Sequence, residues 1–200
     1  MKKMLLGAAV ILFSAVSLNV QAQKIKLVNG DLGVLAGQNE INTEFVYDGM
    51  SVGKFKTEEE YIAKKTEEYN KKEAGKGDSW AKSWKADREA RFEPKFNELF
   101  GESSGITSGG SPKAKYTMIV KTIFTEPGFN VGIWRENASL NLEISIVETA
   151  NKGKALAEIT VMKALGRTFG GFDFDTGVRL AEAYADAGKA LGKFVKSKVK

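Results

Sequence analysis

One alternating run constrains the fold of this chain more than any other feature. It covers residues 138–146, where apolar side chains (Leu140, Leu142, Ile144, Ile146) alternate with polar ones (Ser139, Asn141, Glu143, Ser145). Since successive side chains of a strand point to opposite faces, the run predicts a strand with one buried and one solvated face. Such strands are typical of antiparallel sheets, because parallel sheets are covered on both faces.

Two further runs extend this prediction to an antiparallel meander. Residues 116–124 are rich in β-forming side chains, and residues 157–162 alternate again. The link at residues 151–153 is short, so we expect a hairpin in which Gly153 adopts a left-handed conformation. Residues 101–115 are rich in Gly and Ser and predict a loop before the meander.

The region before that loop predicts two strands and a surface helix. Residues 24–38 begin like an edge strand or an irregular arm, and residues 44–55 predict a second strand that could turn back at Asp48-Gly49. Thr57 with Glu60 three residues later is a capping-box pattern, which marks a helix start. The helix has a thin apolar stripe and acid–base pairs four residues apart. These pairs are Glu60/Lys64, Glu67/Lys71 and Glu68/Lys72.

A stripe of aromatic residues marks the next helix. Its members fall four or eight residues apart and therefore share one helix face: Trp80, Trp84, Phe92, Phe96 and Phe100. Pro94 is expected to kink or divide this helix near Glu93. The stripe could be a platform for a sugar or a partner, but packing of the helix onto the sheet is the favoured interpretation.

The last helix is predicted to begin at Asp175 or Thr176 and to run into the lysine-rich tail. Its apolar stripe consists of Val178, Ala181, Tyr184, Ala185, Gly188, Leu191, Gly192 and Val195. The two glycines predict a close approach of this helix to the sheet. Together the elements predict an α+β fold: a mostly antiparallel sheet of four to five strands with helices packed on one face. We expect a single domain over residues 23–200, with a charged helical insertion at residues 57–100.

The first 22 residues have the organisation of a secretory signal. Lys2 and Lys3 precede an apolar run, and Val20-Gln21-Ala22 ends the segment as a small-x-small cleavage site. The apolar run is shorter than the roughly 20 residues that span a bilayer. The sequence therefore predicts cleavage before Gln23, a periplasmic or secreted protein of a Gram-negative cell, and no stable membrane insertion after cleavage.

Composition excludes most familiar catalytic chemistry. The chain contains no His and no Cys, so it has no Ser-His-Asp triad, thiol nucleophile or familiar zinc site, and we expect no cofactor. Its 25 acidic residues leave hydrolysis by paired carboxylates open, although no pair stands out. The net charge of +5 falls to +3 when Lys2 and Lys3 leave with the signal, which does not indicate a nucleic-acid partner.

The link between the last strand and the last helix is the first candidate site. Residues 166–175 combine glycines, aromatic rings, one basic and two acidic side chains. Gly170-Gly171 near a helix start could bind an anion, but the segment lacks the ending of a phosphate loop and the full ligand set of a calcium loop. The predicted ligand-binding residues are Arg167, Phe169, Phe172, Asp173 and Asp175. Alternatively, the segment is a plain connection whose phenylalanines fill the core.

Residues 126–135 form the second candidate site. They begin with Glu126-Pro127-Gly128 and carry Phe129, Val131, Ile133 and Trp134. Apolar residues on a loop can mark a binding lip, and Trp134 is the predicted ligand-binding residue here. They can equally fold back onto the sheet or form a short extra strand.

The second half of the chain resembles bacterial cell-envelope families whose domains have no known function. The resemblance covers about residues 116–200. It begins with the strand at 116–124, the Glu126-Pro127-Gly128 turn, the strand at 138–147 and the hairpin through Gly153. It ends with Thr176-Gly177-Val178-Arg179-Leu180, which leads into an Ala/Gly-rich helix. It implies a small α/β sandwich, often lipid-anchored, with no catalytic residues to transfer. This chain differs in lacking a lipobox cysteine and in its long helical insertion. We therefore expect a non-catalytic envelope protein that binds a partner protein or a small ligand; the alternative is a carboxylate-dependent hydrolase acting on envelope glycans.

Overall fold

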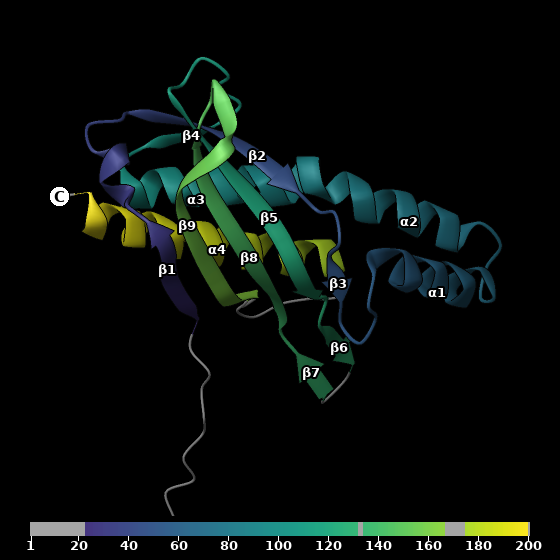
Figure 1. Ribbon diagram of the computed structural model, residues 1–200. Helices are drawn as coiled ribbons and strands as arrows, with labels where there is room; N and C mark the ends of the chain where they lie inside the picture. The colour runs from purple at the N-terminus through teal and green to yellow at the C-terminus, as the bar shows by residue number, and fades with distance from the viewer. Residues whose placement is uncertain (1–22, 132–133, 167–174, 200) are drawn as a thin grey trace, which may run out of the picture.

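The computed structural model describes residues 23–131, 134–166 and 175–199, and a seven-stranded mixed sheet lies at its centre (Figure 1). The strand order is β1-β9-β8-β5-β2-β4, and β3 also pairs with β5. The strands are β1 (Lys24–Gly30), β2 (Glu40–Val46), β3 (Ser51–Val52), β4 (Thr107–Gly109), β5 (Tyr116–Glu126), β8 (Ala138–Glu148) and β9 (Asn151–Gly166). A short 3-10 helix, η1 (Leu32–Leu35), follows β1.

The predicted meander is confirmed, but the sheet as a whole is mixed. β5, β8, β9 and β1 are antiparallel neighbours, whereas β2, β3 and β4 lie parallel to their partners. The expectation of a mostly antiparallel sheet of four to five strands is therefore wrong. The chain returns from β2 to β4 and β5 through a long helical connection, and such crossovers allow parallel pairing. β4 lies within the segment that the sequence predicts as a loop.

The hairpin that the sequence allows at Asp48-Gly49 does not form. β2 and β3 follow one another along the same edge of β5, with Phe45 opposite Val120 and Val52 opposite Thr125. Gly49, at φ 76°, forms a turn in which Met50 N donates to the carbonyl of Tyr47 at 3.2 Å. The chain therefore turns briefly out of line and then continues in its original direction along β5.

The β8–β9 hairpin is present, with its turn earlier than predicted. The turn lies at Thr149 and Ala150, and Gly153 belongs to β9 without a positive φ. The predicted left-handed conformation of Gly153 is wrong. The faces of β8 are as expected: Leu140, Leu142, Ile144 and Ile146 are each at most 1% exposed.

Two helices cover the buried face of the sheet (Figure 1). They are α3 (Glu93–Ser104) and α4 (Thr176–Lys198). Phe92 stacks on Tyr184 of α4 with ring centroids 5.1 Å apart, and the Tyr184 hydroxyl hydrogen-bonds Thr122 of β5 at 2.7 Å. Val178 is 43% exposed and does not belong to the buried stripe of α4.

The two glycines of α4 approach α3 and not the sheet. A Cβ on Gly188 would lie 2.3 Å from the carbonyl oxygen of Phe96, and one on Gly192 would lie 2.6 Å from that of Phe100. The predicted role of these glycines in close packing is thus correct, but the predicted neighbour is wrong. Helical spacing identifies the buried face of a helix without identifying the element that covers it.

A π-helical turn interrupts the aromatic helix beside Pro94. α2 (Lys76–Asp87) runs into this turn, η2 (Arg88–Phe92), and then into α3. Glu93 N donates to the carbonyl of Arg88, five residues back. Since proline has no N–H and its ring crowds the carbonyl four residues earlier, the widened turn is the local response to Pro94.

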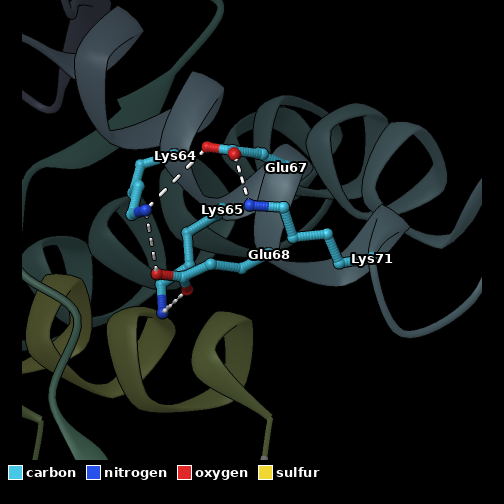
Figure 2. Close-up of polar contacts among 5 residues, drawn as sticks. All are labelled: Lys64, Lys65, Glu67, Glu68 and Lys71. Carbon is cyan, nitrogen blue, oxygen red and sulfur yellow. Dashed lines mark hydrogen bonds and ion pairs between the residues drawn. The ribbon is translucent and has the colours of Figure 1, made fainter.

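α1 (Glu58–Asn70) and α2 form a hairpin that extends away from the sheet (Figure 1). Thr57 caps α1 as predicted, its hydroxyl accepting from Glu60 N at 3.2 Å. Figure 2 shows ion pairs on the exposed surface of α1: Lys64–Glu67, Lys64–Glu68, Lys65–Glu68 and Lys71–Glu67. The Glu67/Lys71 pair is confirmed, whereas Glu68 pairs with Lys64 and Lys65. Exposed pairs of this kind contribute little stability.

A separate two-stranded ribbon projects beyond the end of the sheet (Figure 1). It consists of β6 (Phe129–Val131) and β7 (Trp134–Glu136), which pair antiparallel. In the part of the chain that the structure describes, no helix has the length and apolar character needed to cross a membrane.

Candidate functional site

Four of the six predicted ligand-binding residues lie outside the described residues: Arg167, Phe169, Phe172 and Asp173. The other two, Asp175 and Trp134, are described, and they lie in different surroundings.

Asp175 caps α4 and holds it to the π-helical turn. Its Oδ1 accepts from Gly177 N at 2.8 Å, and its Oδ2 accepts from Arg91 Nη1 at 2.7 Å. Burial opposes ionisation of Asp175, but the hydrogen bonds from Arg91 and Gly177 outweigh it and lower the pKa of this carboxyl. Arg91 also pairs with Asp87 at 3.1 Å. The predicted cap at Asp175 is therefore confirmed.

Trp134 lies on the projecting ribbon and is 71% exposed. Val131, its cross-strand partner, is 68% exposed, and Phe129 is 43% exposed. The alternative of a short extra strand is confirmed, and these strands present apolar side chains to solvent. A binding role for Trp134 stays a prediction.

A cleft of about 650 Å³ lies between this ribbon and α1. Phe129 and Val131 form one wall, and Phe55, Tyr61 and Tyr69 form the opposite one. Directly paired residues of a ribbon project to the same face, so Trp134 shares a ribbon face with Val131, although Trp134 is not among the described residues that line the cleft. Apolar side chains therefore lie on both sides of the cleft, and charged and polar side chains line it as well.

The aromatic wall is part of a larger ring cluster. Tyr61 meets Phe55 and Trp80 edge-on, each with centroids 5.6 Å apart, and Tyr69 meets Trp80 at 5.7 Å. Trp84 lies behind them, 5.0 Å from Tyr61. Edge-to-face pairs are favourable and hold rings at fixed angles.

A buried polar cluster anchors this wall. Glu58, only 7% exposed, accepts a hydrogen bond from Trp84 Nε1 at 2.6 Å and pairs with the guanidinium of Arg88. The Arg88 guanidinium also lies 4.1 Å from the ring centroid of Tyr47. A buried carboxylate needs such partners, so the cluster ties the start of α1 to α2 and β2.

The aromatic stripe therefore packs inside the protein, as favoured from the sequence. Its last four members are buried, and Trp80 is partly buried. The two tryptophans pack on α1, whereas Phe96 meets Phe45 of the sheet with centroids 5.5 Å apart. With Phe92 stacked on Tyr184 of α4, one stripe thus packs on α1, on the sheet and on α4.

Arg179 fixes the base of the ribbon. This side chain is 4% exposed; its Nε donates to the carbonyl of Pro127 at 3.1 Å, and its Nη2 donates to the carbonyl of Gly128 at 3.1 Å and to Thr176 Oγ1 at 3.0 Å. Gly128 has φ 64°, and a Cβ there would lie 2.4 Å from the carbonyl oxygen of Glu136. The turn is therefore specific for glycine and is held by α4.

Glu126 is the carboxyl group within the described lining of the cleft. Its Oε1 accepts from Gly128 N at 3.0 Å. Burial raises the pKa of Glu126, and the nearby charge of Glu136 adds to this effect. Three basic residues line the same cleft: Lys54, Lys65 and Arg179. Within the described ranges no group of three or more carboxylates that could hold a metal ion comes together.

The sequence predicted the ribbon wall of this cleft as an apolar loop but did not predict the aromatic wall on the α1 side. The ribbon was visible as apolar residues after a Pro-Gly turn, but α1 was predicted only as a surface helix. The available signal was the pair Tyr61 and Tyr69, whose spacing of eight places both on one helix face.

Comparison with known proteins finds only a weak structural likeness. No protein-family model matches the sequence, and no curated protein matches it. The similar solved structures include two PelC dodecamers from Paraburkholderia phytofirmans. The first has a TM-score of 0.40 at 10% identity and covers 85% of this chain and 97% of that chain. The second, a single-residue variant, has a TM-score of 0.38 at 10% identity and covers 82% and 97%. Likeness at this level does not identify a function.

Proposed function

We propose that this chain is an exported, non-catalytic envelope protein that binds a small ligand in the cleft between α1 and the β6–β7 ribbon. The observation that carries the proposal is the cleft itself. Its volume of about 650 Å³ lies within the range of roughly 300–1,000 Å³ typical of ligand sites, and its lining combines aromatic and aliphatic side chains with charged ones.

The surroundings of the cleft support a preformed site. Arg179 holds the ribbon from one side, and the Glu58 cluster holds α1 from the other. A site held by packed elements loses less conformational entropy when a ligand binds. The same contacts leave Val131 exposed at the entrance.

A second candidate function, carboxylate-dependent hydrolysis of envelope glycans, rests on Glu126. Its raised pKa suits a general acid. Glycoside hydrolysis in most families needs a second carboxylate across the scissile bond. Among the described residues that line the cleft, Glu126 is the only acid, and this favours binding over hydrolysis.

The test is a ligand screen with a blocked cleft. Small molecules and oligosaccharides from the cell envelope are screened by NMR line broadening against wild type, Val131→Glu and Val28→Glu. Val28, on β1, is a matched control because it is also an exposed strand valine, 55% exposed compared with 68% for Val131. We expect ligands that bind wild type and Val28→Glu but not Val131→Glu.

Two results would contradict the proposal. Ligands that bind all three proteins equally would place the site elsewhere. A ligand that is turned over by wild type, and not by a folded Glu126→Gln variant, would establish the hydrolase instead.

A further inference from the structure

Two aromatic rings on the α1 side of the cleft, Phe55 and Tyr69, each have an ammonium group over the ring. Lys54 Nζ lies 5.7 Å from the ring centroid of Phe55, and Lys65 Nζ lies 5.9 Å from that of Tyr69. Lys72 Nζ lies 5.7 Å from the same Tyr69 ring. The arrangement of a ring with a neighbouring cation thus occurs twice along one wall.

The charge of the cleft is positive. Its described lining contributes Lys54 and Lys65 at the surface and Glu126 as an acid, while Arg179 is buried and bonded to the base of the ribbon. Lys65 pairs with Glu68 at 3.3 Å, but both side chains are more than one third exposed at 34% and 42%, so an incoming anion can compete for this ammonium group. Positive charge that lines a cleft concentrates anions there.

The polar groups of the cleft suit a ligand with many hydroxyls. Tyr61, Thr176 and Glu126 line it together, and they offer hydroxyl and carboxyl oxygens among the apolar side chains. Glu126 accepts from Gly128 N and Thr176 accepts from Arg179, and the hydrocarbon tail of a fatty acid would offer no partner for the hydrogen-bonding capacity that these two groups have left. A saccharide ring has an apolar C–H face for an aromatic ring and hydroxyls for the polar groups.

From this juxtaposition we infer that the cleft binds an acidic oligosaccharide, with sugar rings against Phe55 and Tyr69 and their carboxylates beside Lys54 and Lys65. The inference rests on the proposed function and names its ligand class. The repeat of ring and cation on one wall matches a chain in which successive sugars carry an acid group.

The probes are trigalacturonate, its uncharged methyl ester, and palmitate, each titrated by calorimetry at low and high salt. We expect trigalacturonate to bind most tightly and to weaken with salt, because exposed charges are screened. The double variant Lys54→Gln/Lys65→Gln should weaken its binding about three- to tenfold, the effect of removing two exposed charges. The control Lys24→Gln/Lys26→Gln has the same change in net charge, at exposed lysines of β1, and should bind like wild type.

The outcomes separate the ligand class from the proposed site. Equal binding of the methyl ester, or binding of palmitate alone, would refute an acidic saccharide; loss of that binding in Val131→Glu would still support the cleft as the site. If both double lysine variants weakened the binding of trigalacturonate equally, the attraction would come from the net charge of the protein, and the inference would also be refuted. If none of the three probes bound, or if their binding did not change when Val131 was replaced, both the ligand class and the cleft as a site would be overturned.

Discussion

Replacing Gly188 with alanine tests the helix contact on which the core depends. In a free helix the change stabilises by about 1 kcal/mol, because alanine has the higher helix propensity. Here the added Cβ would lie 2.3 Å from the carbonyl oxygen of Phe96 and 3.0 Å from its carbon. Both atoms belong to the backbone of α3, so no side chain can rotate to make room.

The magnitude follows from the movement required. Ordinary contact begins near 3.4 Å, so α3 and α4 must separate by about 1 Å. Overpacking in a closely packed core costs about 1–3 kcal/mol beyond what it gains, because interiors compress little. We expect Gly188→Ala to lower the free energy of unfolding by about 2 kcal/mol. For a chain of this length that lowers Tm by about 4–8 °C.

Gly101 supplies the matched control within α3. A Cβ there would lie 3.6 Å from its nearest neighbour, the carbonyl oxygen of Ile106, which is ordinary contact. Gly101→Ala should therefore show the propensity gain alone and raise Tm by about 2–4 °C. Calorimetric melting of the two variants beside wild type is the measurement. If Gly188→Ala were as stable as Gly101→Ala, the close approach of α3 and α4 would be refuted.

Three further predictions concern the aromatic wall, the cap of α4 and export. Trp84→Ala should lower the free energy of unfolding by about 3–5 kcal/mol in urea titrations, because Trp84 is 5% exposed and hydrogen-bonded to Glu58. Trp80→Ala should lower it by less, and equal losses in the two variants would contradict this packing. The pKa of Asp175 is lower in the folded protein than the ordinary pKa of 3.8, so ionised Asp175 stabilises the fold above that pH, and this contribution disappears as pH falls through the folded-state pKa. The difference in stability between wild type and Asp175→Asn should therefore close between pH 6 and pH 2 in urea titrations. A difference that does not depend on pH would show that ionisation of Asp175 does not contribute to stability. Mass spectrometry after expression in a Gram-negative host should find Gln23 at the N-terminus; a membrane-bound product that retains Met1 would refute cleavage.

Local patterns in the sequence determined the elements that depend on neighbouring residues. The alternation along β8 predicted its buried face, because that face is set by the two-residue period of a strand. Thr57 and Asp175 were identified as caps since a cap satisfies backbone groups two or three residues away. The apolar spacing of α4 predicted most of its buried stripe for the same local reason.

Strand direction and helix partners were decided only by the tertiary structure. Side-chain alternation is the same in parallel and antiparallel strands, so it could not show that β2 and β3 lie parallel to β5. Gly188 was identified as a site of close approach, but the approaching element is α3. Its identity depends on how distant segments pack, which helical periodicity does not encode.

The candidate site divides in the same way. The ribbon with Trp134 was predicted from its own residues, as apolar side chains after a Pro-Gly turn. The cleft was not, because its opposite wall comes from Phe55, Tyr61 and Tyr69, more than 60 residues earlier in the chain. The sequence by itself determined the chemical character of each wall. Only the packing of α1, β5 and α4 decided that the two walls face one another, because that packing depends on contacts between residues far apart in the chain.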